Sequence, residues 1–310
     1  MFSVIFPGQG SQIVGMGKEL YSKYDIIKKL FNEADEILKF RISNLILEGP
    51  KDQLDLTENT QPAIFLVSYS IFQLIKKEHK IDLNKASYFA GHSLGEYTAL
   101  ASAESLSFSE TLKILKKRGS AMQSAVSKGQ GGMVAVLGSE INKIEKIIEG
   151  NQNKYECFIA NDNSNGQLVV SGNITDIDKF IIDLKESSIK NIKLPVSAPF
   201  HCKLMKKATD IMTQEIKKLE FKNPKNTLIS NVTGEEIVSA SMIKDLLIKQ
   251  IESRVRWRES VMLMIDKGIN QFIEIGPGKI LSGLIKRINK DVKVSAINNE
   301  EDISLININD

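Results

Sequence analysis

The chain has 310 residues, of which 42% are hydrophobic and 25% charged, so it is long enough to bury a sizeable core and to form two domains. A net charge of +3 makes no case for a nucleic-acid or membrane partner, and the most apolar run, residues 63–75, is too short to span a bilayer. The two cysteines, Cys157 and Cys202, have neither metal-ligand nor disulfide spacing, and the first residues lack the features of a signal peptide, so we expect a reduced, cytoplasmic chain.

The first 127 residues alternate predicted strands and helices. An apolar strand over residues 3–6 precedes helical patterns around residues 17–40, and a long helix is predicted over residues 62–79. Pro62 is expected in its first turn, where a missing N–H costs nothing. A buried strand over 86–90 leads into a helix from Glu96 onward, and the next helix begins near Ser107, where Glu110 completes a capping box.

The middle of the chain has a different pattern. Strands are predicted over residues 133–137, 157–160, 168–171 and 192–196, with helices over 139–149 and 175–187. Ser139 is expected to cap the first of these helices. The order βαββαβ is typical of a ferredoxin-like unit, so we predict a small domain over residues 128–198, inserted into a larger one.

After His201 the alternation of helix and strand resumes. Helices are predicted from His201 to Leu219, over 242–251, over 257–267 and up to Ile288, with strands over 228–230 and 271–275. Beyond Asn298 the sequence gives no clear signal. Such alternation predicts an α/β fold with a mostly parallel sheet covered on both faces, so residues 1–127 and 199–310 are expected to form one discontinuous large domain.

Gly91-His92-Ser93-Leu94-Gly95 is the most informative stretch, because a predicted strand here turns sharply into a predicted helix. Small residues on both sides of the bend permit a strained turn that raises the central serine out of the sheet. The helix N-terminus then points at the atom that this serine attacks. The pattern predicts a nucleophilic Ser93, with a tight structural turn as the alternative.

Only three histidines are available as a general base. His79 lies at the end of a predicted helix beside several lysines, which favours a solvated position. His92 is adjacent to the serine, and neighbouring side chains on such a turn diverge. His201 lies where the predicted small domain returns the chain to the large one, opening a helix, and is the predicted base, with a structural helix-terminus residue as the alternative.

Two further segments are less specific. Glycines flank Gln9 directly after the first strand, but their spacing fits neither a dinucleotide fingerprint nor a phosphate-binding loop. Two interpretations remain: the Gln9 N–H is part of an oxyanion hole together with the N–H of Leu94, or the segment is a structural turn. Arg118 follows Lys116 and Lys117 on a predicted helix, and this spacing alone favours a solvated basic face. An α/β-hydrolase acid between the serine and a late histidine is not evident, so a plain esterase fits badly.

These segments together resemble one family, the bacterial malonyl-CoA:acyl carrier protein transacylases of type II fatty acid synthesis. The resemblance covers nearly the whole chain and includes, in order, FPGQGSQ (6–12), TQPA (60–63), GHSLGEY (91–97), KRG..MQ (117–123), NGQLVVSG (165–172), APFH (198–201) and EIGPGK (274–279). It implies a hydrolase-like large domain that carries a ferredoxin-like insert, in agreement with the predicted architecture.

The resemblance also implies a role for each matching residue. Ser93 would be the nucleophile, His201 its base, and the backbone N–H groups of Gln9 and Leu94 the oxyanion hole. Arg118 would bind the free malonyl carboxylate, and the backbone carbonyl of Gln250 would orient the histidine in place of an acid. Gln61 and Gln167 would line the cleft, and Phe200 is the bulky residue that malonyl-type members carry where methylmalonyl-type members have a smaller one.

The implied reaction moves a malonyl group from malonyl-CoA, through a malonyl-serine, to the phosphopantetheine thiol of an acidic acyl carrier protein, with no metal or cofactor in the enzyme and with a monomeric chain. Lysine clusters at Lys113, Lys116 and Lys117 and at Lys203, Lys206 and Lys207 are weak candidates for the carrier-protein contact. Two other classes remain: a serine hydrolase or an acyltransferase of different acyl preference, and a non-catalytic acyl-binding scaffold. Arg118 and the insert argue against simple hydrolysis, and an intact Ser93 and His201 argue against the scaffold.

Overall fold

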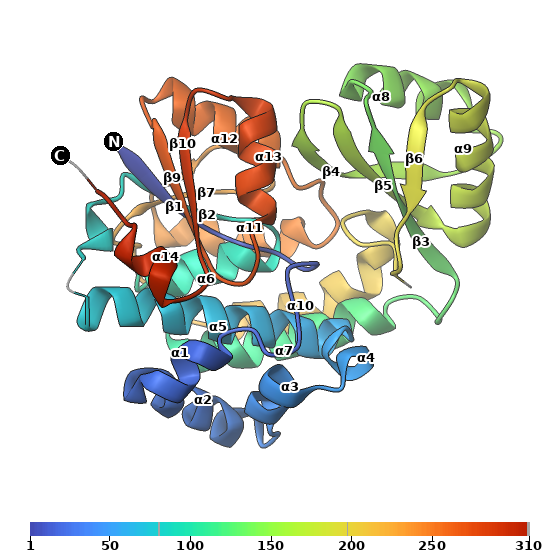
Figure 1. Cartoon of the computed structure of the whole chain (residues 1–310). Helices are drawn as coiled ribbons and strands as arrows, with labels where there is room; N and C mark the ends of the chain where they lie inside the picture. The colour runs from blue at the N-terminus through green and yellow to red at the C-terminus, as the bar shows by residue number, and fades with distance from the viewer. Residues whose placement is uncertain (80, 197, 309–310) are drawn as a thin grey trace.

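Two β-sheets organise the chain in the computed structural model, which describes residues 1–79, 81–196 and 198–308 (Figure 1). The larger sheet has the strand order β10-β9-β1-β2-β7-β8, and its neighbouring strands are parallel except for the antiparallel pair β7–β8. Its strands are β1 (Phe2–Phe6), β2 (Tyr88–Gly91), β7 (Thr227–Ile229), β8 (Glu236–Ile237), β9 (Gln271–Ile275) and β10 (Lys293–Ile297). The predicted α/β class with a mostly parallel sheet is confirmed.

Helices cover both faces of this sheet, which is why its central strands β1 and β2 are buried along their whole length. In β1, Val4 and Phe6 belong to a core shared with helices α5, α6 and α7, whereas Ile5 packs with residues of α12 and α13 on the other face. The helices of this part of the chain are α1 (Lys18–Lys23), α2 (Asp25–Leu38), α3 (Ile42–Glu48), α4 (Lys51–Leu54), α5 (Thr57–Lys77), α6 (Leu94–Ser102), α7 (Phe108–Ser124), α10 (Lys206–Lys218), α11 (Ala240–Gln250), α12 (Trp257–Asp266), α13 (Ile280–Ile288) and α14 (Glu300–Ser304).

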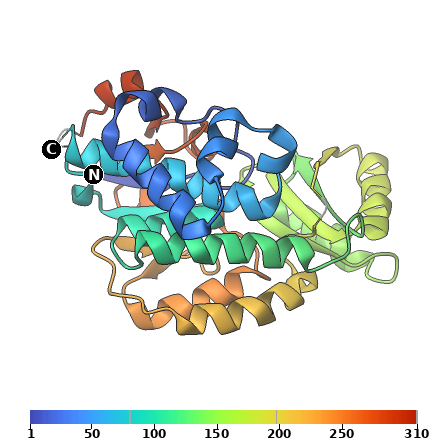
Figure 2. The same cartoon turned by 90° about the horizontal axis from the view of Figure 1, so that it is seen from below.

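One of these two helical layers is continuous across segments distant in sequence. Seen from below, α5, α7, α10 and α11 lie side by side, and each contacts the next (Figure 2). Helix α2 and the short helices α3 and α4 contact α5 from outside. This layer therefore brings the ends of α7 and α11 to the same edge of the molecule, where β2 enters α6.

The second sheet is antiparallel and has the strand order β4-β5-β3-β6. Its strands are β3 (Gly131–Leu137), β4 (Cys157–Ser164), β5 (Gln167–Asn173) and β6 (Lys190–Lys193), and its helices are α8 (Ile141–Gly150) and α9 (Ile174–Glu186). Val134, Val170, Ile144 and Phe180 share a separate hydrophobic core under these helices. The predicted βαββαβ unit is confirmed, while the domain boundaries at residues 128 and 198 stay a prediction.

Strand β4 connects the small sheet to the segment that precedes α12 and to α12 itself. The backbone N–H of Asp162 donates to the Val255 carbonyl (2.9 Å), and the Val255 N–H donates to the Ala160 carbonyl (2.8 Å). Arg258 on α12 holds the buried Asp162 carboxylate through two contacts of 3.0 Å and one of 2.8 Å. The segment 250–256, which follows α11, is thereby fixed against the small sheet.

Several predicted boundaries are wrong. Helix α5 begins at Thr57 rather than Pro62, so Pro62 lies inside the helix. The first turn was missed because Thr57, Glu58 and Asn59 are polar and do not continue the apolar periodicity of the helix. Helix α8 is preceded by Glu140 and has no side-chain cap, so Ser139 does not cap it. Strand β6 lies at 190–193 rather than 192–196, and its exposed edge position removes the burial pattern on which the prediction relied.

Short and late elements were also missed, namely α3, α4, β8, β10 and α14. The first helical turn after His201 is a 3-10 turn over Lys203–Met205, and α10 starts only at Lys206, so His201 precedes rather than opens the helix. By contrast, β9 has its predicted bounds, and the Ser107 side chain caps α7 by accepting from the Glu110 N–H (3.2 Å). This is half of the predicted capping box, because the Glu110 carboxylate accepts from the Ser107 hydroxyl (2.6 Å) rather than from its backbone N–H. Within the described ranges, no helix has both the length and the apolarity needed to cross a membrane.

Candidate active site

A strained turn places Ser93 at the carboxyl edge of the large sheet. Strand β2 ends at Gly91, helix α6 begins at Leu94, and Ser93 between them has φ 54° and ψ −107°. A Cβ atom on Gly91 would lie 2.0 Å from the Gly95 backbone, and one on Gly95 would lie 2.3 Å from the Phe6 carbonyl oxygen. Only glycine fits at both positions, so these residues determine the turn that lifts the serine out of the sheet.

His201 lies next to this serine. Its Nε2 is 2.8 Å from the Ser93 Oγ, and its Nδ1 is 2.9 Å from the backbone carbonyl oxygen of Gln250, the last residue of α11. A carbonyl oxygen only accepts, so Nδ1 carries the proton and Nε2 is free to accept the hydrogen bond from the Ser93 hydroxyl. The backbone of His201 has φ 58°, a strained conformation of the kind that clusters at functional sites.

The surroundings keep His201 neutral. Burial and the nearby positive charge of Arg118 lower its pKa to about 3, although its hydrogen bond to the Gln250 carbonyl opposes this shift. At neutral pH the imidazole is therefore deprotonated at Nε2 and available to take a proton from the hydroxyl.

Arg118 on α7 is fully buried, so the interpretation of this residue as part of a solvated face is wrong. Its guanidinium donates to the Gln61 Oε1 (2.8 Å), to the Gln250 Oε1 (2.8 Å) and to the Ser93 Oγ (3.1 Å). Its Cζ lies 5.5 Å from the centre of the Tyr97 ring, and its Nε has no hydrogen-bond partner within the described part of the chain. The adjacent Lys117 is exposed, as expected for that basic face.

Two residues behind the serine were missed by the sequence analysis. The Asn231 Oδ1 accepts from the Ser93 N–H (2.6 Å), and the Asn231 Nδ2 donates to the Gly91 carbonyl (2.8 Å). The Glu96 Oε2 accepts from the backbone N–H of Asn231 (3.0 Å) and from the Gln250 Nε2 (2.7 Å). Asn231 follows β7, which neighbours β2, and polar residues at the carboxyl ends of adjacent parallel strands are the signal that points to it.

Glu96 is an acid in an apolar position. Its carboxyl is buried, and burial raises its pKa to about 7, against the opposing effects of the Asn231 and Gln250 hydrogen bonds and of Arg118. Its position in the first turn of α6, three residues after Ser93, is the sequence feature that could have pointed to it.

The loop that carries Gln9 packs against the turn at Ser93. A Cβ atom on Gly8 would lie 2.7 Å from the His92 carbonyl oxygen, so glycine allows this close approach. The Gln9 side chain donates to the Thr57 Oγ1 (3.3 Å). The backbone N–H groups of Gln9 and Leu94 donate to no group in the described ranges of the chain, which leaves both N–H groups available to a ligand.

The remaining predicted site residues are distributed differently. Gln61 lies on α5 against Arg118, as given above. Phe200 is buried directly before His201, and its carbonyl accepts from the Ser171 Oγ of β5 (2.7 Å). Gln167 lies at the turn of the β4–β5 hairpin, where its side chain accepts a hydrogen bond from Arg287. The structure therefore groups Gln61 with Ser93 and groups Gln167 with Arg287.

The other two histidines have other partners. The His92 Nε2 lies 2.9 Å from the Asn163 Oδ1 of β4, and its ring is 5.9 Å from the Trp257 ring, so its side chain diverges from Ser93. His79 is half-buried rather than solvated, with its ring 6.0 Å from the Tyr24 ring.

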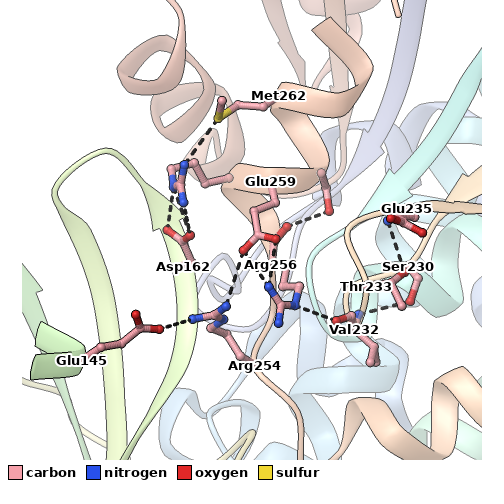
Figure 3. A network of polar contacts seen from close by, with 12 residues as sticks. Glu145, Asp162, Ser230, Val232, Thr233, Glu235, Arg254, Arg256, Glu259 and Met262 are labelled. Atoms are coloured by element: carbon pink, nitrogen blue, oxygen red, sulfur yellow. Dashed lines mark hydrogen bonds and ion pairs between the residues drawn. The ribbon is translucent and has the colours of Figure 1, made fainter. Parts of the chain in front are cut away.

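A cavity of about 430 Å³ opens on the His201 side of the cluster, between the small sheet and the segment after α11. Ion pairs border it: Arg254 lies between Glu145 on α8 (3.0 Å) and Glu259 on α12 (3.6 Å), and Arg256 contacts Glu259 (2.9 Å) (Figure 3). Cys157 and Cys202 also line it, and burial raises the pKa of both thiols to about 12. Among the described residues, no group of three or more His, Cys, Asp or Glu side chains is arranged to hold a metal ion.

The chain is similar to known proteins over nearly its whole length. The model of the acyl transferase domain family matches residues 3–303. The malonyl CoA-acyl carrier protein transacylase of Bacillus subtilis is 40% identical over 307 residues, which cover 97% of this chain and 94% of that protein.

Solved structures resemble the whole chain as well. The crystal structure of acyl-carrier-protein-S-malonyltransferase from Bartonella henselae has a TM-score of 0.95 and 38% identity, covering 98% of this chain and 97% of that one. A malonyl-transacylase solved in complex with its type II PKS acyl-carrier protein has a TM-score of 0.94 and 33% identity, covering 98% and 97%.

Proposed function

This chain belongs to the acyl transferase domain family, and we propose that it transfers the malonyl group of malonyl-CoA to the phosphopantetheine thiol of an acyl carrier protein. The proposal rests on the groups that surround the Ser93 Oγ. The Ser93 Oγ lies 2.8 Å from the His201 Nε2 and 3.1 Å from the buried guanidinium of Arg118. A nucleophile, its base and a cation for a free carboxylate meet at that oxygen.

In the first half-reaction, the Ser93 Oγ attacks the thioester carbonyl of malonyl-CoA while the His201 Nε2 takes the hydroxyl proton. The thioester C–S bond then breaks, His201 returns the proton to the leaving sulfur, and free CoA and malonyl-Ser93 result. The Gln250 carbonyl holds the imidazole and stabilises the imidazolium that forms between these two proton transfers.

The tetrahedral intermediate carries a negative oxygen that needs donors. The backbone N–H groups of Gln9 and Leu94 fill this role, because the Gly8 loop packs against the turn that begins α6. The N-terminus of α6 adds a favourable dipole. Removing one such donor typically raises the barrier by about 2.7–4 kcal/mol.

Arg118 selects the acyl group. Its direct partners are neutral oxygens, so the malonyl carboxylate supplies a counter-charge in direct contact with this buried cation. The same carboxylate offsets the positive charge that lowers the pKa of His201, so a bound malonyl group makes the base stronger. Acetyl-CoA offers neither effect.

In the second half-reaction, the phosphopantetheine thiol of the carrier protein attacks the malonyl-serine carbonyl. His201 takes the thiol proton and returns it to the Ser93 oxygen as the ester bond breaks. The residues that hold His201 and Arg118 are buried, which favours thiol transfer over hydrolysis by water. Phe200, packed before His201, is the residue we assign to the discrimination against methylmalonyl-CoA, which a simple pocket achieves by about 1–3 kcal/mol.

The partners of the proposed reaction are malonyl-CoA and an acidic acyl carrier protein. We also propose that the enzyme is cytoplasmic and monomeric and needs no cofactor. Of the lysines predicted to contact the carrier protein, Lys203 pairs with Glu156 and Lys206 pairs with Asp210. Lys207 is exposed. Carrier-protein contact at Lys203 and Lys206 therefore competes with existing surface pairs.

The test is a transfer assay with malonyl-CoA and a holo acyl carrier protein, in which the mass of the carrier protein and the free CoA are both followed. We expect the carrier protein to gain one malonyl group per CoA released, and the Ser93→Ala variant to give neither product. Release of CoA without any malonylated carrier protein would instead establish a thioester hydrolase.

A further inference from the structure

Glu96 is a buried carboxylate that no step of the proposed reaction uses. It lies in the first turn of α6, behind Ser93, and its Oε2 accepts from the Gln250 Nε2 (2.7 Å) and from the Asn231 N–H (3.0 Å). Burying an acid is unfavourable unless its hydrogen bonds repay the desolvation. The groups that it holds indicate what Glu96 does.

Gln250 is the residue through which Glu96 reaches the site. Its backbone carbonyl accepts from the His201 Nδ1, and its side-chain Oε1 accepts from Arg118. Its Nε2 donates to Glu96 and to the Ser93 carbonyl (3.1 Å). One residue therefore positions both the base and the cation.

The orientation of the Gln250 amide depends on the charges at its two ends. A rotation by 180° would turn its NH₂ toward the Arg118 guanidinium and its oxygen toward the Glu96 carboxylate, which creates two repulsive contacts. Glu96 and Arg118 thus fix the amide together, from opposite sides. Asn231 is the other partner of Glu96, and its side-chain oxygen accepts a hydrogen bond from the Ser93 N–H.

We propose that Glu96 is a positioning residue, which fixes the Gln250 amide and through it sets both the His201 imidazole and the Arg118 guanidinium against Ser93. This inference rests on the proposed function. It predicts that loss of the Glu96 charge slows serine acylation and also reduces the preference for malonyl over acetyl groups, although Glu96 touches neither substrate.

The charge on Glu96 changes in the neutral range. The ionisable groups that act on it are Arg118 on α7 and the neighbouring Tyr97, and its Oε1 has no partner among the residues that the structure describes. Burial raises its pKa to about 7. The carboxylate that holds Gln250 therefore predominates above pH 7, and the acylation rate is expected to fall below it.

The experiment compares wild-type protein with Glu96→Gln, which keeps the shape and an accepting oxygen but removes the charge. Asp183→Asn is the matched control, because Asp183 is also a buried acid, bonded to Tyr155 in the small domain. Acylation by malonyl-CoA and by acetyl-CoA is followed by intact mass between about pH 5 and pH 9, with thermal unfolding as a check of folding.

We expect Glu96→Gln to slow malonyl acylation by up to about 100-fold, to slow acetyl acylation less, and to abolish the fall in rate near pH 7. Asp183→Asn should retain the wild-type rate and pH profile. A Glu96→Gln variant with the wild-type acyl preference and pH profile would overturn the inference, even if it were less stable.

A double-mutant cycle tests whether Glu96 acts through Gln250. If it does, adding Glu96→Gln to Gln250→Met should change the acylation rate little beyond Gln250→Met alone, whereas additive losses would contradict the inference. Sulfonylation of Ser93 by phenylmethylsulfonyl fluoride, which needs no malonyl-CoA, separates the two proposals. A wild-type protein that takes no malonyl group refutes the proposed function, while slower sulfonylation of Glu96→Gln still supports the role of Glu96 in positioning His201.

Discussion

Arg118 is a buried cation that favours an acyl group with a free carboxylate even before substrate binds. Its guanidinium is fully buried, and its direct partners are the neutral oxygens of Gln61, Gln250 and Ser93. A buried charge without a direct counter-charge is costly. A substrate carboxylate therefore gains more from Arg118 than it would from a solvated arginine.

Replacement of this cation is expected to weaken malonyl transfer selectively. Arg118→Ala should raise the barrier to acylation by malonyl-CoA by about 2–5 kcal/mol, because it removes one partner of a buried charge pair. Acylation by acetyl-CoA should change much less. Lys117→Ala is the matched control on the same helix, since Lys117 is exposed; equal losses with both acyl groups would contradict the carboxylate role. Initial acylation rates from intact mass give the comparison.

Glu96 links the site to stability. Its pKa rises from 4.5 to about 7 on folding, so the folded protein keeps a proton that the unfolded chain releases in this window. Stability from this group is present below about pH 4.5 and is lost as the pH rises to about 7. The loss amounts to about 3 kcal/mol. Positioning by an ionised Glu96 thus costs stability at working pH.

The corresponding prediction concerns the difference in the free energy of unfolding between wild-type protein and Glu96→Gln. Relative to wild type, Glu96→Gln should gain up to about 3 kcal/mol in the free energy of unfolding between pH 5 and pH 8. His201 has the opposite sign, because its pKa is lowered to about 3 and its stability contribution is lost as the pH falls from 6.5. That contribution is common to both proteins and cancels in the difference. Urea unfolding at several pH values measures this difference between the two proteins. A difference that does not depend on pH would refute the raised pKa of Glu96.

At the scale of elements, the turn between β2 and α6 is the most constrained joint. A Cβ atom at Gly95 would lie 2.3 Å from the Phe6 carbonyl oxygen, and Phe6 leads directly into the loop that carries Gln9. An added methyl group must therefore separate β1 from the turn and disturb the nucleophile and the oxyanion loop together.

Gly95→Ala is expected to lose at least about 1–3 kcal/mol of stability through overpacking and to acylate about 100-fold more slowly or worse. Gly283→Ala in α13 is the matched control, because a Cβ atom there meets nothing within 4 Å. It should gain about 0.5–1 kcal/mol, since alanine favours a helix over glycine. Chemical unfolding and acylation rates decide the matter; a Gly95→Ala protein that acylates normally would contradict the steric argument.

The sequence predicts elements well where burial repeats regularly and poorly where it does not. Strand β9 and the capped start of α7 agree with prediction, because apolar periodicity and a serine N-cap are local signals. The exposed strand β6 and the first turn of α5 carry no such signal. At the site, Ser93 was evident from its flanking glycines, whereas the burial of Arg118 and the place of Asn231 depend on how distant segments pack.

At the scale of the whole molecule, one ion pair joins the small sheet to helix α12 of the large-sheet layer. Asp162 on β4 is fully buried and is held by Arg258 on α12, whose side chain is 22% exposed. Beside it, Arg254 connects Glu145 and Glu259 across the same junction (Figure 3). The segment between Gln250 and Arg258 carries the carbonyl that orients His201, so this junction supports the site.

Arg258→Leu is expected to destabilise the fold by about 3–5 kcal/mol, because it leaves the Asp162 carboxylate buried without its partner. Glu215→Gln is the control: it breaks the exposed pair with Lys218 and should cost at most about 1 kcal/mol. Guanidinium unfolding gives both values. A loss for Arg258→Leu no greater than that for Glu215→Gln would show that the pair does not hold the junction.

The central claim, a malonyl group on Ser93 held by Arg118, is tested most directly by peptide mass mapping of the protein after brief exposure to malonyl-CoA. The account predicts one malonyl group on the peptide that contains Ser93, none on that peptide in Ser93→Ala, and displacement of the group by a holo acyl carrier protein. A malonyl group on any other residue, or an unmodified Ser93 while CoA is released, would contradict it.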